Sequence, residues 1–238
     1  MFRFILFFAF FAFFTFSCTE KTTPSVSIIE PVLPVTKDTA YTYLALGDSY
    51  TIGESVKEAE RFPNQLAASL KDSSFKISPV KIVAKTGWTT DELQTGITAS
   101  GLTADSTFDM VTLLIGVNNQ YRNRSVEDYK PQFTALLERA IKFAKGKKER
   151  VIVVSIPDYA YTPFGGGRQS ISAGIDAYNA ANEAITKSMG VAYAQITPIS
   201  REGLNDPTLV ATDGLHPSGK QYGKWVEVMK PIARAFFK

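Results

Sequence analysis

The chain has 238 residues, of which 45% are hydrophobic and 21% are charged, a balance typical of a globular protein with a sizeable core. This composition excludes a disordered or collagen-like chain, and a surplus of three Lys and Arg residues (26 against 23 Asp and Glu) does not favour a nucleic-acid partner. One Cys and one His are too few for an internal disulfide or for a zinc site of Cys and His ligands, so we expect no metal centre.

The first segment of the chain has the order of an export signal. Residues 1–17 carry one cation, Arg3, followed by an unbroken run of Phe, Ile, Leu and Ala residues and then by small or polar residues. The apolar run has only about half of the roughly 20 residues that a membrane-spanning helix needs. We therefore predict a signal peptide over residues 1–17 that is removed, with a permanent membrane anchor as the alternative.

The only cysteine, Cys18, directly follows this segment. Together with the residues before it, Cys18 resembles the lipobox of bacterial lipoproteins, in which small residues precede an acylated Cys. Thr15 and Phe16 depart from the Leu and the small residue preferred in that motif. The resemblance implies an exported lipoprotein of the bacterial cell envelope, anchored to a membrane through a lipid on Cys18. A lone buried thiol is the alternative.

Residues 18–40 are interpreted as the linker between this anchor and a folded domain. After Cys18 they contain three Pro residues with many Thr and Ser residues and show no sustained hydrophobic period. We expect one domain over residues 41–238.

From residue 41 onward, short apolar runs alternate with segments of helical period. The predicted strands are Tyr43–Leu46, Val80–Ala84, Met110–Ile115, Val151–Ile156 and Val191–Ile196, and the helical periods lie at 62–70, 133–144, 171–189 and 222–236. We expect Pro131 to set the start of the second of these helices. Several strands are apolar on both faces, which is typical of parallel strands covered by helices on two sides. The sequence thus predicts an α/β domain with a parallel sheet of about five strands and a site at their carboxyl ends.

A serine stands where the first predicted strand ends. The apolar run leads into Gly47, Asp48, Ser49 and Tyr50, which places Ser49 in a strand-to-helix turn where a nucleophile is exposed. The turn is not the G-x-S-x-G elbow of α/β-hydrolases, because Thr51 occupies the second Gly position. A helix cap made by Asp48 and Ser49 is the alternative interpretation.

Aromatic residues follow the fourth predicted strand. Residues 158–169 contain Tyr159, Tyr161 and Phe164, and Gly165–Gly167 remove the side chains that would stiffen the segment. We expect this loop to border a substrate pocket on the same sheet edge as Ser49 and to adjust on binding, with an ordinary surface loop as the alternative.

The only histidine provides a candidate partner for the serine. His216 follows Asp213 by three residues in a loop before the last helix, and this spacing lets the carboxylate accept from Nδ1–H. Nε2 is then free to accept a serine proton. Pro217 favours extended backbone at His216 and keeps it in the loop. A purely structural His is the alternative.

Four motifs resemble the sequence blocks of the SGNH (GDSL-type) hydrolases. They are Gly47–Tyr50, Lys85–Trp88 at the place of the glycine block, Ile115–Asn119 at the place of the Gly-x-Asn-Asp block, and Asp213–His216. All four occur in the order of the family and span essentially the whole predicted domain.

The resemblance implies a single three-layer α/β/α domain of the flavodoxin-like kind and the chemistry of a serine hydrolase. It makes Ser49 the nucleophile, His216 the general base and then acid, and Asp213 the residue that orients His216. The Ser49 N–H, the Gly87 N–H and the Asn118 side-chain amide would form the oxyanion hole, in which each donor is typically worth about 3–4 kcal/mol.

Two positions depart from the family pattern. Tyr50 stands where many members have Leu, and Asn119 stands where the family usually has Asp. In this chain, the amide of Asn119 must therefore hold the group near Asn118 that the family's Asp orients.

We expect a serine esterase that hydrolyses carboxylic esters through an acyl-enzyme intermediate at the cell envelope, without a cofactor. Its expected partners are a small-molecule, lipid or glycan ester and, through the lipid anchor, a membrane. The alternatives are an acetylesterase acting on acetylated polysaccharide and a non-catalytic lipoprotein that binds glycan or lipid. The family acts on lysophospholipids, simple acyl esters and acetylated sugars alike, so fold and triad do not choose among these substrates.

Overall fold

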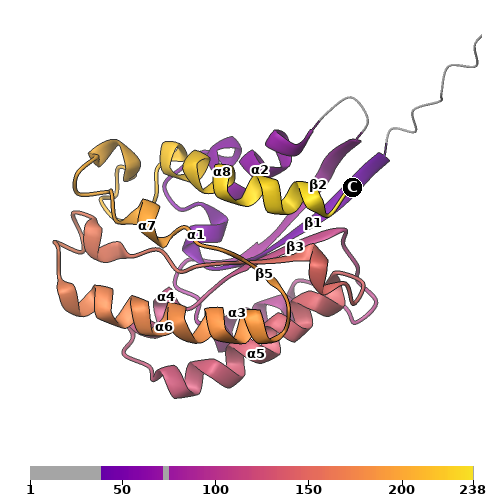
Figure 1. Cartoon of the computed structure of the whole chain (residues 1–238), viewed down its shortest axis with the longest axis horizontal. Coiled ribbons are helices and arrows are strands. Elements are labelled where there is room, and N and C mark those ends of the chain that lie inside the picture. The colour runs from indigo at the N-terminus through magenta and orange to yellow at the C-terminus, as the bar shows by residue number, and fades with distance from the viewer. Residues whose placement is uncertain (1–38, 72–74, 238) are drawn as a thin grey trace, which may run out of the picture. The chain divides into compact units, whose positions relative to one another are not determined.

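A parallel sheet of five strands lies at the centre of the computed structural model, which describes residues 39–71 and 75–237 (Figure 1). The strands are β1 Thr39–Gly47, β2 Phe75–Ala84, β3 Met110–Leu114, β4 Val151–Val154 and β5 Ala192–Ala194, in the order β2-β1-β3-β4-β5. All five predicted strands are present, and every neighbouring pair is parallel. This arrangement confirms the predicted fold.

Helices cover both faces of the sheet. They are α1 Ser49–Ile52, α2 Phe62–Leu70, α3 Thr90–Ala99, α4 Val117–Tyr121, α5 Val126–Phe143, α6 Gln169–Ser188, α7 Thr197–Ser200 and α8 Gly219–Ala235. Single 3₁₀ turns lie at Glu58–Glu60, Lys148–Arg150, Tyr159–Tyr161 and Pro207–Leu209. In Figure 1, α2 and α8 lie on one side of the sheet and α3, α5 and α6 on the other, which gives three layers. None of the described helices combines the length and the apolar composition that a membrane crossing requires.

The start of α5 differs from the predicted one. The helix begins at Val126, and Pro131 lies inside it. Ser125 caps the first turn, because its hydroxyl accepts a hydrogen bond of 3.0 Å from the Asp128 N–H. A proline in the second turn removes one helical hydrogen bond, and the cap together with the buried face of the helix outweighs that loss.

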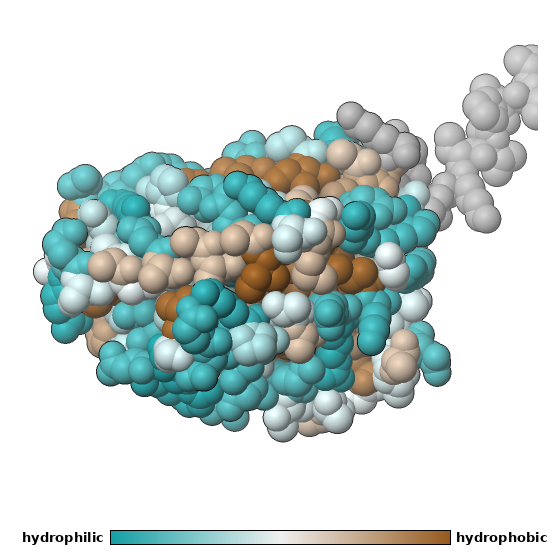
Figure 2. All heavy atoms as spheres, turned by 60° about the horizontal axis from the view of Figure 1, so that its bottom comes forward, coloured by the Kyte–Doolittle hydropathy of each residue, from teal (hydrophilic) through white to brown (hydrophobic). Residues whose placement is uncertain are grey.

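Two central strands, β3 and β4, lie entirely within the core. Every residue of β3 and of β4 is buried, since helices pack on both sides of them. The helices that cover the sheet are amphipathic, and α5 buries Phe133, Leu136 and Leu137 at helical spacing. The surface that comes forward in Figure 2 is accordingly mostly hydrophilic, with smaller hydrophobic patches.

The strand order predicts a ligand-binding crevice at the carboxyl ends of the strands. β1 lies between β2 and β3, and Gly47 at its end is in register with Ala84 and Leu114 at the ends of these neighbours. The chain after β1 and the chain after β3 therefore emerge side by side, at the switch point where doubly wound sheets bind ligands.

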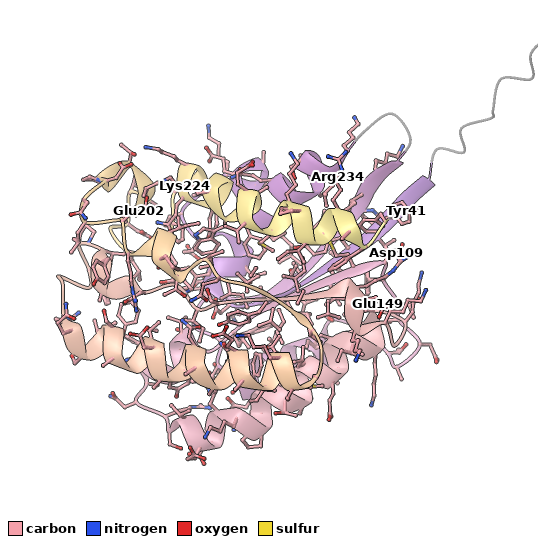
Figure 3. The ribbon with its side chains drawn as sticks, viewed as in Figure 1. Tyr41, Asp109, Glu149, Glu202, Lys224 and Arg234 are labelled. Atoms are coloured by element: carbon pink, nitrogen blue, oxygen red, sulfur yellow. The ribbon has the colours of Figure 1, made fainter. Side chains whose placement is uncertain are left out.

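Ion pairs are found near the beginning of the strands and between α8 and the segment after α7 (Figure 3). At the edge where the strands begin, Asp109 accepts hydrogen bonds of 2.9 and 3.1 Å from the N–H and the hydroxyl of Thr42 and pairs with Lys145 at 2.7 Å. Lys224 of α8 pairs with Glu202, which follows α7, at 2.5 Å.

Candidate active site

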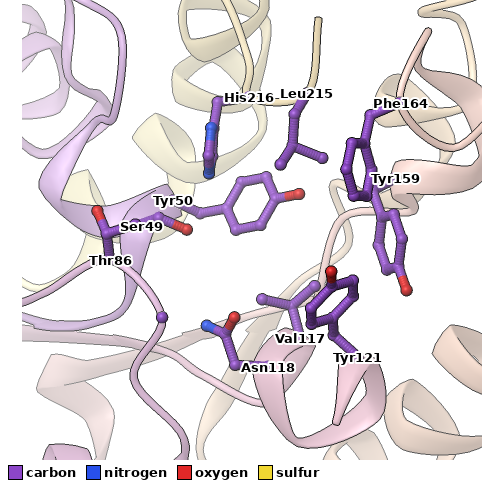
Figure 4. Close-up of a pocket in the computed structure, with 11 residues that line it drawn as sticks. Ser49, Tyr50, Thr86, Val117, Asn118, Tyr121, Tyr159, Phe164, Leu215 and His216 are labelled. Carbon is purple, nitrogen blue, oxygen red and sulfur yellow. The ribbon is translucent and has the colours of Figure 1, made fainter. Parts of the chain in front are cut away.

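A pocket of about 260 Å³ lies at the carboxyl edge of the sheet (Figure 4). It is lined by Ser49, Tyr50, Thr86, Gly87, Val117, Asn118, Tyr121, Tyr159, Phe164, Leu215 and His216. These residues come from the segments that follow β1, β2, β3 and β4 and from the loop before α8. The fold thus brings Ser49, Gly87, Asn118 and His216, which are far apart in the sequence, into one cavity.

His216 and Asp213 form the pair that their spacing predicts. His216 Nδ1 lies 2.6 Å from Asp213 Oδ2, while Asp213 Oδ1 accepts hydrogen bonds of 2.9 Å from the N–H groups of Leu215 and His216. These backbone bonds fix the carboxylate within the turn. With Nδ1–H directed at the carboxylate, the neutral ring keeps Nε2 unprotonated, and in Figure 4 the ring extends toward Ser49.

A third group holds the carboxylate, and sequence reasoning missed it. The Ser55 hydroxyl donates a hydrogen bond of 2.7 Å to Asp213 Oδ2. Partial burial raises the pKa of Asp213, but the hydrogen bonds from Ser55, His216 and Leu215 outweigh it and lower this pKa to about 2. Asp213 is therefore ionised at any ordinary pH. Since Ser55 and Asp213 are 158 positions apart, no spacing rule could connect them.

The turn after β1 offers a nucleophile and a helix cap, and the structure gives these two features to different residues. Asp48 caps α1, where its buried Oδ1 accepts a hydrogen bond of 3.0 Å from the Tyr50 N–H. Ser49 begins the helix and lines the pocket, and its hydroxyl makes no hydrogen bond to any residue that the structure describes. Asp48 is thus the structural residue, and Ser49 is left available for chemistry.

The three N–H donors expected to form an oxyanion hole belong to residues that line the same pocket. Within the described ranges, neither the Ser49 N–H nor the Gly87 N–H donates a hydrogen bond to another residue. Asn118 Nδ2 donates one hydrogen bond of 3.0 Å to the Trp88 carbonyl, which fixes the amide and leaves its second N–H for a ligand. The set has the composition of a preorganised oxyanion hole.

The loop that presents Gly87 is held from outside the pocket. Gly87 has a φ of 87°, in the left-handed region that favours glycine. Arg122 donates a hydrogen bond of 2.6 Å to the Gly87 carbonyl and one of 3.0 Å to Glu92 of α3. With its carbonyl turned to Arg122, the Gly87 loop is fixed relative to α3 and α4.

Asn119, which departs from the family pattern, anchors the neighbouring helix. Its buried amide accepts a hydrogen bond of 3.1 Å from the Thr90 N–H and donates one of 2.8 Å to the Thr90 hydroxyl, which in turn donates to Gln132. An aspartate could make only the accepting bond, and it would compete with Gln132 for the hydroxyl proton. The amide therefore links α4 to α3 and, through the Thr90 hydroxyl, to α5 without a buried charge.

Three aromatic rings, from Tyr121, Tyr159 and Phe164, form what we call the aromatic wall of the pocket. Their ring centroids are 6.2 to 6.3 Å apart, and the Tyr121 and Phe164 side chains are 56% and 46% exposed at the mouth. Two of the three aromatic residues expected from the loop therefore line the pocket. Tyr161 does not, because the 3₁₀ turn at Tyr159–Tyr161 directs it elsewhere. Tyr121, which comes from α4, was not predicted.

The glycines of this loop have a packing role that composition does not reveal. A Cβ at Gly165 would lie 1.8 Å from the Tyr159 carbonyl oxygen, so only glycine fits against that turn. The Gly165 N–H also donates a hydrogen bond of 3.1 Å to the Thr162 hydroxyl. This close turn places Phe164 beside Tyr159.

The sequence also led to predictions about a metal centre and a lipid attachment site. Within the residues that the structure describes, no group of three or more His, Cys, Asp or Glu side chains is arranged to hold a metal ion. Cys18, the expected lipid attachment site, lies outside the described residues, as do residues 1–17 and most of the predicted linker.

Comparison with known families gives an independent result. The model of the GDSL-like lipase/acylhydrolase family matches residues 45–224, which is most of the chain. Among curated proteins, none matches the chain significantly.

Solved structures share the fold at low sequence identity. The crystal structure of TesA has a TM-score of 0.64 at 16% identity and covers 82% of this chain and 99% of its own. The lipase/acylhydrolase from Enterococcus faecalis has a TM-score of 0.61 at 19% identity, with coverage of 82% and 96%. Est24, a carbohydrate acetylesterase from Sinorhizobium meliloti, has a TM-score of 0.59 at 19% identity, with coverage of 83% and 100%.

Proposed function

Since the chain belongs to the GDSL-like lipase/acylhydrolase family and is an ester-hydrolysing enzyme, we propose that it is a serine esterase that works through an acyl-enzyme intermediate. The observation that carries this proposal is the 2.6 Å contact between His216 Nδ1 and Asp213, in a pocket that also holds the unpaired Ser49 hydroxyl. A base oriented by a carboxylate beside a serine is the arrangement that nucleophilic catalysis needs.

In the proposed reaction, the Ser49 oxygen attacks the ester carbonyl carbon while its proton passes to His216 Nε2. The tetrahedral intermediate carries a negative oxygen, which the N–H groups of Ser49 and Gly87 and the Asn118 amide stabilise. Collapse of the intermediate breaks the bond to the alcohol, which leaves with the proton from His216. Water, deprotonated by His216, then attacks the acyl-Ser49 ester and releases the acid and the free enzyme.

The neighbouring charges suit these steps. Asp213 stays ionised, because its hydrogen bonds hold its pKa at about 2, and it can stabilise the imidazolium that forms on His216. Beyond the donors, the pocket lining includes the apolar side chains of Val117, Leu215 and Phe164, which can contact the apolar part of an ester.

Hydrolysis of a panel of esters tests the proposal. The panel contains p-nitrophenyl esters from acetyl to palmitoyl, an acetylated glycan and a lysophospholipid. Ser49→Ala and His216→Ala should each lower kcat about 10⁴-fold or more, because the two groups act as a unit, and Asp213→Asn should cost less. Full activity in folded Ser49→Ala protein would overturn the mechanism, and the chain-length profile of the wild type identifies the substrate class.

We further propose that the chain is exported and anchored to a membrane of the bacterial envelope through a lipid on Cys18. The support comes from the sequence of residues 1–18. The first residue that the structure describes, Thr39, begins β1 at the end of the sheet opposite the pocket. A Cys18→Ser variant should move from the detergent phase to the aqueous phase of a detergent extraction. Equal partitioning of variant and wild type, or an unmodified Cys18 in the mass spectrum, would refute the anchor.

A further inference from the structure

The residue that follows the candidate nucleophile carries an unpaired hydroxyl inside the pocket. Tyr50 is only 3% exposed and lines the cavity, and its hydroxyl makes no hydrogen bond to any residue in the described ranges. Figure 4 shows the ring running from Ser49 across the pocket, with the hydroxyl on the side of Phe164 and Tyr159. This hydroxyl replaces the Leu methyl groups that many members of the family have here.

The ring that carries this hydroxyl is held in place by its neighbours. Its centroid lies 5.3 Å from that of His216 and 6.5 Å from that of Trp225. The Tyr222 hydroxyl donates a hydrogen bond of 2.9 Å to the Tyr50 carbonyl and fixes the backbone. The Tyr50 hydroxyl is thus presented to the cavity in a fixed position, as a specific contact requires.

Two other hydroxyls that line this pocket already have protein partners. The Tyr159 hydroxyl donates a hydrogen bond of 2.9 Å to Gln120, and the Thr86 hydroxyl donates to Glu54. The Tyr50 hydroxyl has no protein partner among the described residues and faces the cavity, so a ligand with an oxygen atom there can accept its hydrogen bond. A ligand that covered this hydroxyl without an acceptor would leave it unpaired, at a cost of about 1–3 kcal/mol. Burial, together with the negative charge of Asp48, raises the pKa of Tyr50 well above its usual value, and the group remains a neutral donor.

We propose that Tyr50 is a specificity-determining residue, whose hydroxyl donates a hydrogen bond to an oxygen atom carried by the substrate a few bonds from its ester group. The preferred substrates are then oxygenated esters, with a hydroxyl or ether oxygen in the part that enters the pocket, over esters of purely alkyl groups. The inference rests on the proposed esterase function. The oxygen belongs either to the acyl group or to the alcohol, and the experiment distinguishes the two.

The test uses two pairs of esters that differ only by an oxygen in place of a methylene. For the acyl side they are p-nitrophenyl methoxyacetate and p-nitrophenyl butyrate, and for the alcohol side 2-methoxyethyl acetate and butyl acetate. Within each pair, kcat/KM is measured for the wild type and for Tyr50→Phe, which removes only the hydroxyl. Comparing the ratio between enzymes cancels the intrinsic reactivity of each ester.

In one of the two pairs, Tyr50→Phe should lower the preference for the ether ester about five- to tenfold, the loss expected for one hydrogen bond. Tyr50→Leu, which restores the common family residue, should lose the same preference. Tyr161→Phe removes a tyrosine hydroxyl close by but outside the pocket and should leave both ratios unchanged. The pair that responds shows whether the acyl or the alcohol side carries the oxygen.

Two outcomes would overturn the inference, and they are distinguishable. If the wild type hydrolyses the esters, Ser49→Ala does not, and Tyr50→Phe leaves both ratios unchanged, the esterase function stands and the hydroxyl contacts only water. If the wild type hydrolyses none of the esters, or Ser49→Ala is fully active, the proposed function fails and the inference fails with it.

Discussion

The Ser55 hydroxyl donates a hydrogen bond of 2.7 Å to Asp213 Oδ2, the same oxygen that His216 Nδ1 contacts at 2.6 Å. Ser55 holds this position with a φ of 64°, a left-handed conformation that serine rarely adopts. The turn after α1 therefore reaches across to the loop before α8 and holds the carboxylate. Such strain at a residue that contacts the site is typical of a preorganised centre.

Removing the Ser55 hydroxyl should slow catalysis without weakening substrate binding. Ser55→Ala takes one hydrogen bond from Asp213, so we expect kcat to fall about fivefold to tenfold with KM nearly unchanged. Ser55→Gly also lacks the hydroxyl but relieves the backbone strain, so it should show the same loss in kcat and a higher melting temperature than Ser55→Ala. A kcat equal to that of the wild type in both variants would show that Asp213 does not need Ser55.

Substitution of two adjacent asparagines should affect different properties, catalysis for Asn118 and stability for Asn119. Asn118→Ala removes an oxyanion donor, and we expect kcat to fall about 10²- to 10³-fold with little change in the free energy of unfolding. Asn119→Ala leaves the buried Thr90 N–H without its acceptor, so it should lower the free energy of unfolding by about 1–3 kcal/mol. Urea denaturation and steady-state kinetics on both variants measure the contrast. Equal losses of kcat at unchanged stability would remove the distinction between them.

Burial of Asp48 should make the stability of the protein depend on pH. Burial raises the pKa of Asp48 from 3.8 to about 7, against the opposing effect of the hydrogen bond from the Tyr50 N–H. The folded state then holds the proton more tightly than the unfolded state. The free energy of unfolding should fall as the pH rises from about 4 to about 7, by on the order of 4 kcal/mol at most, and change little above that range.

Asp48→Asn isolates this effect, because the amide oxygen can still accept from the Tyr50 N–H but the side chain no longer titrates. The difference in unfolding free energy between wild type and variant should depend on pH only between about pH 4 and 7. The carboxyl group of Asp213 does not interfere there, since its pKa of about 2 places its stabilising contribution above about pH 4 and its loss below. A constant difference from pH 4 to pH 7 would show that Asp48 is ionised throughout.

Much of the fold was predictable, because the pattern that encodes it is local. The five strands appear as short apolar runs, and the doubly wound layers follow from their alternation with helical periods. The start of α5 was mispredicted, since Pro131 is a strong local signal and the Ser125 cap is a weaker one. A proline inside a helix is tolerated when the helix packs on a sheet, and a single sequence does not show that packing.

Four sequence motifs indicated the residues of the candidate site, but only one contact within it follows from the spacing of neighbouring residues. Asp213 and His216 are three residues apart, and their turn brings them together whatever the rest of the fold does. The contacts of Ser55 with Asp213 and of Arg122 with Gly87 join segments that are distant in sequence, and nothing in the residues marks them. Tyr121 was missed for the same reason, because only the packing of α4 beside the loop after β4 brings it to the pocket.

Covalent labelling of Ser49 tests the central claim most directly. The protein is treated with diisopropyl fluorophosphate, which phosphorylates an activated serine, and the modified residue is located by peptide mass spectrometry. We expect one adduct per chain, on Ser49, with activity lost in proportion to labelling, and no adduct on Ser49→Ala. Rapid labelling of another residue, or full ester hydrolysis by protein labelled at Ser49, would contradict the assignment of Ser49 as the nucleophile.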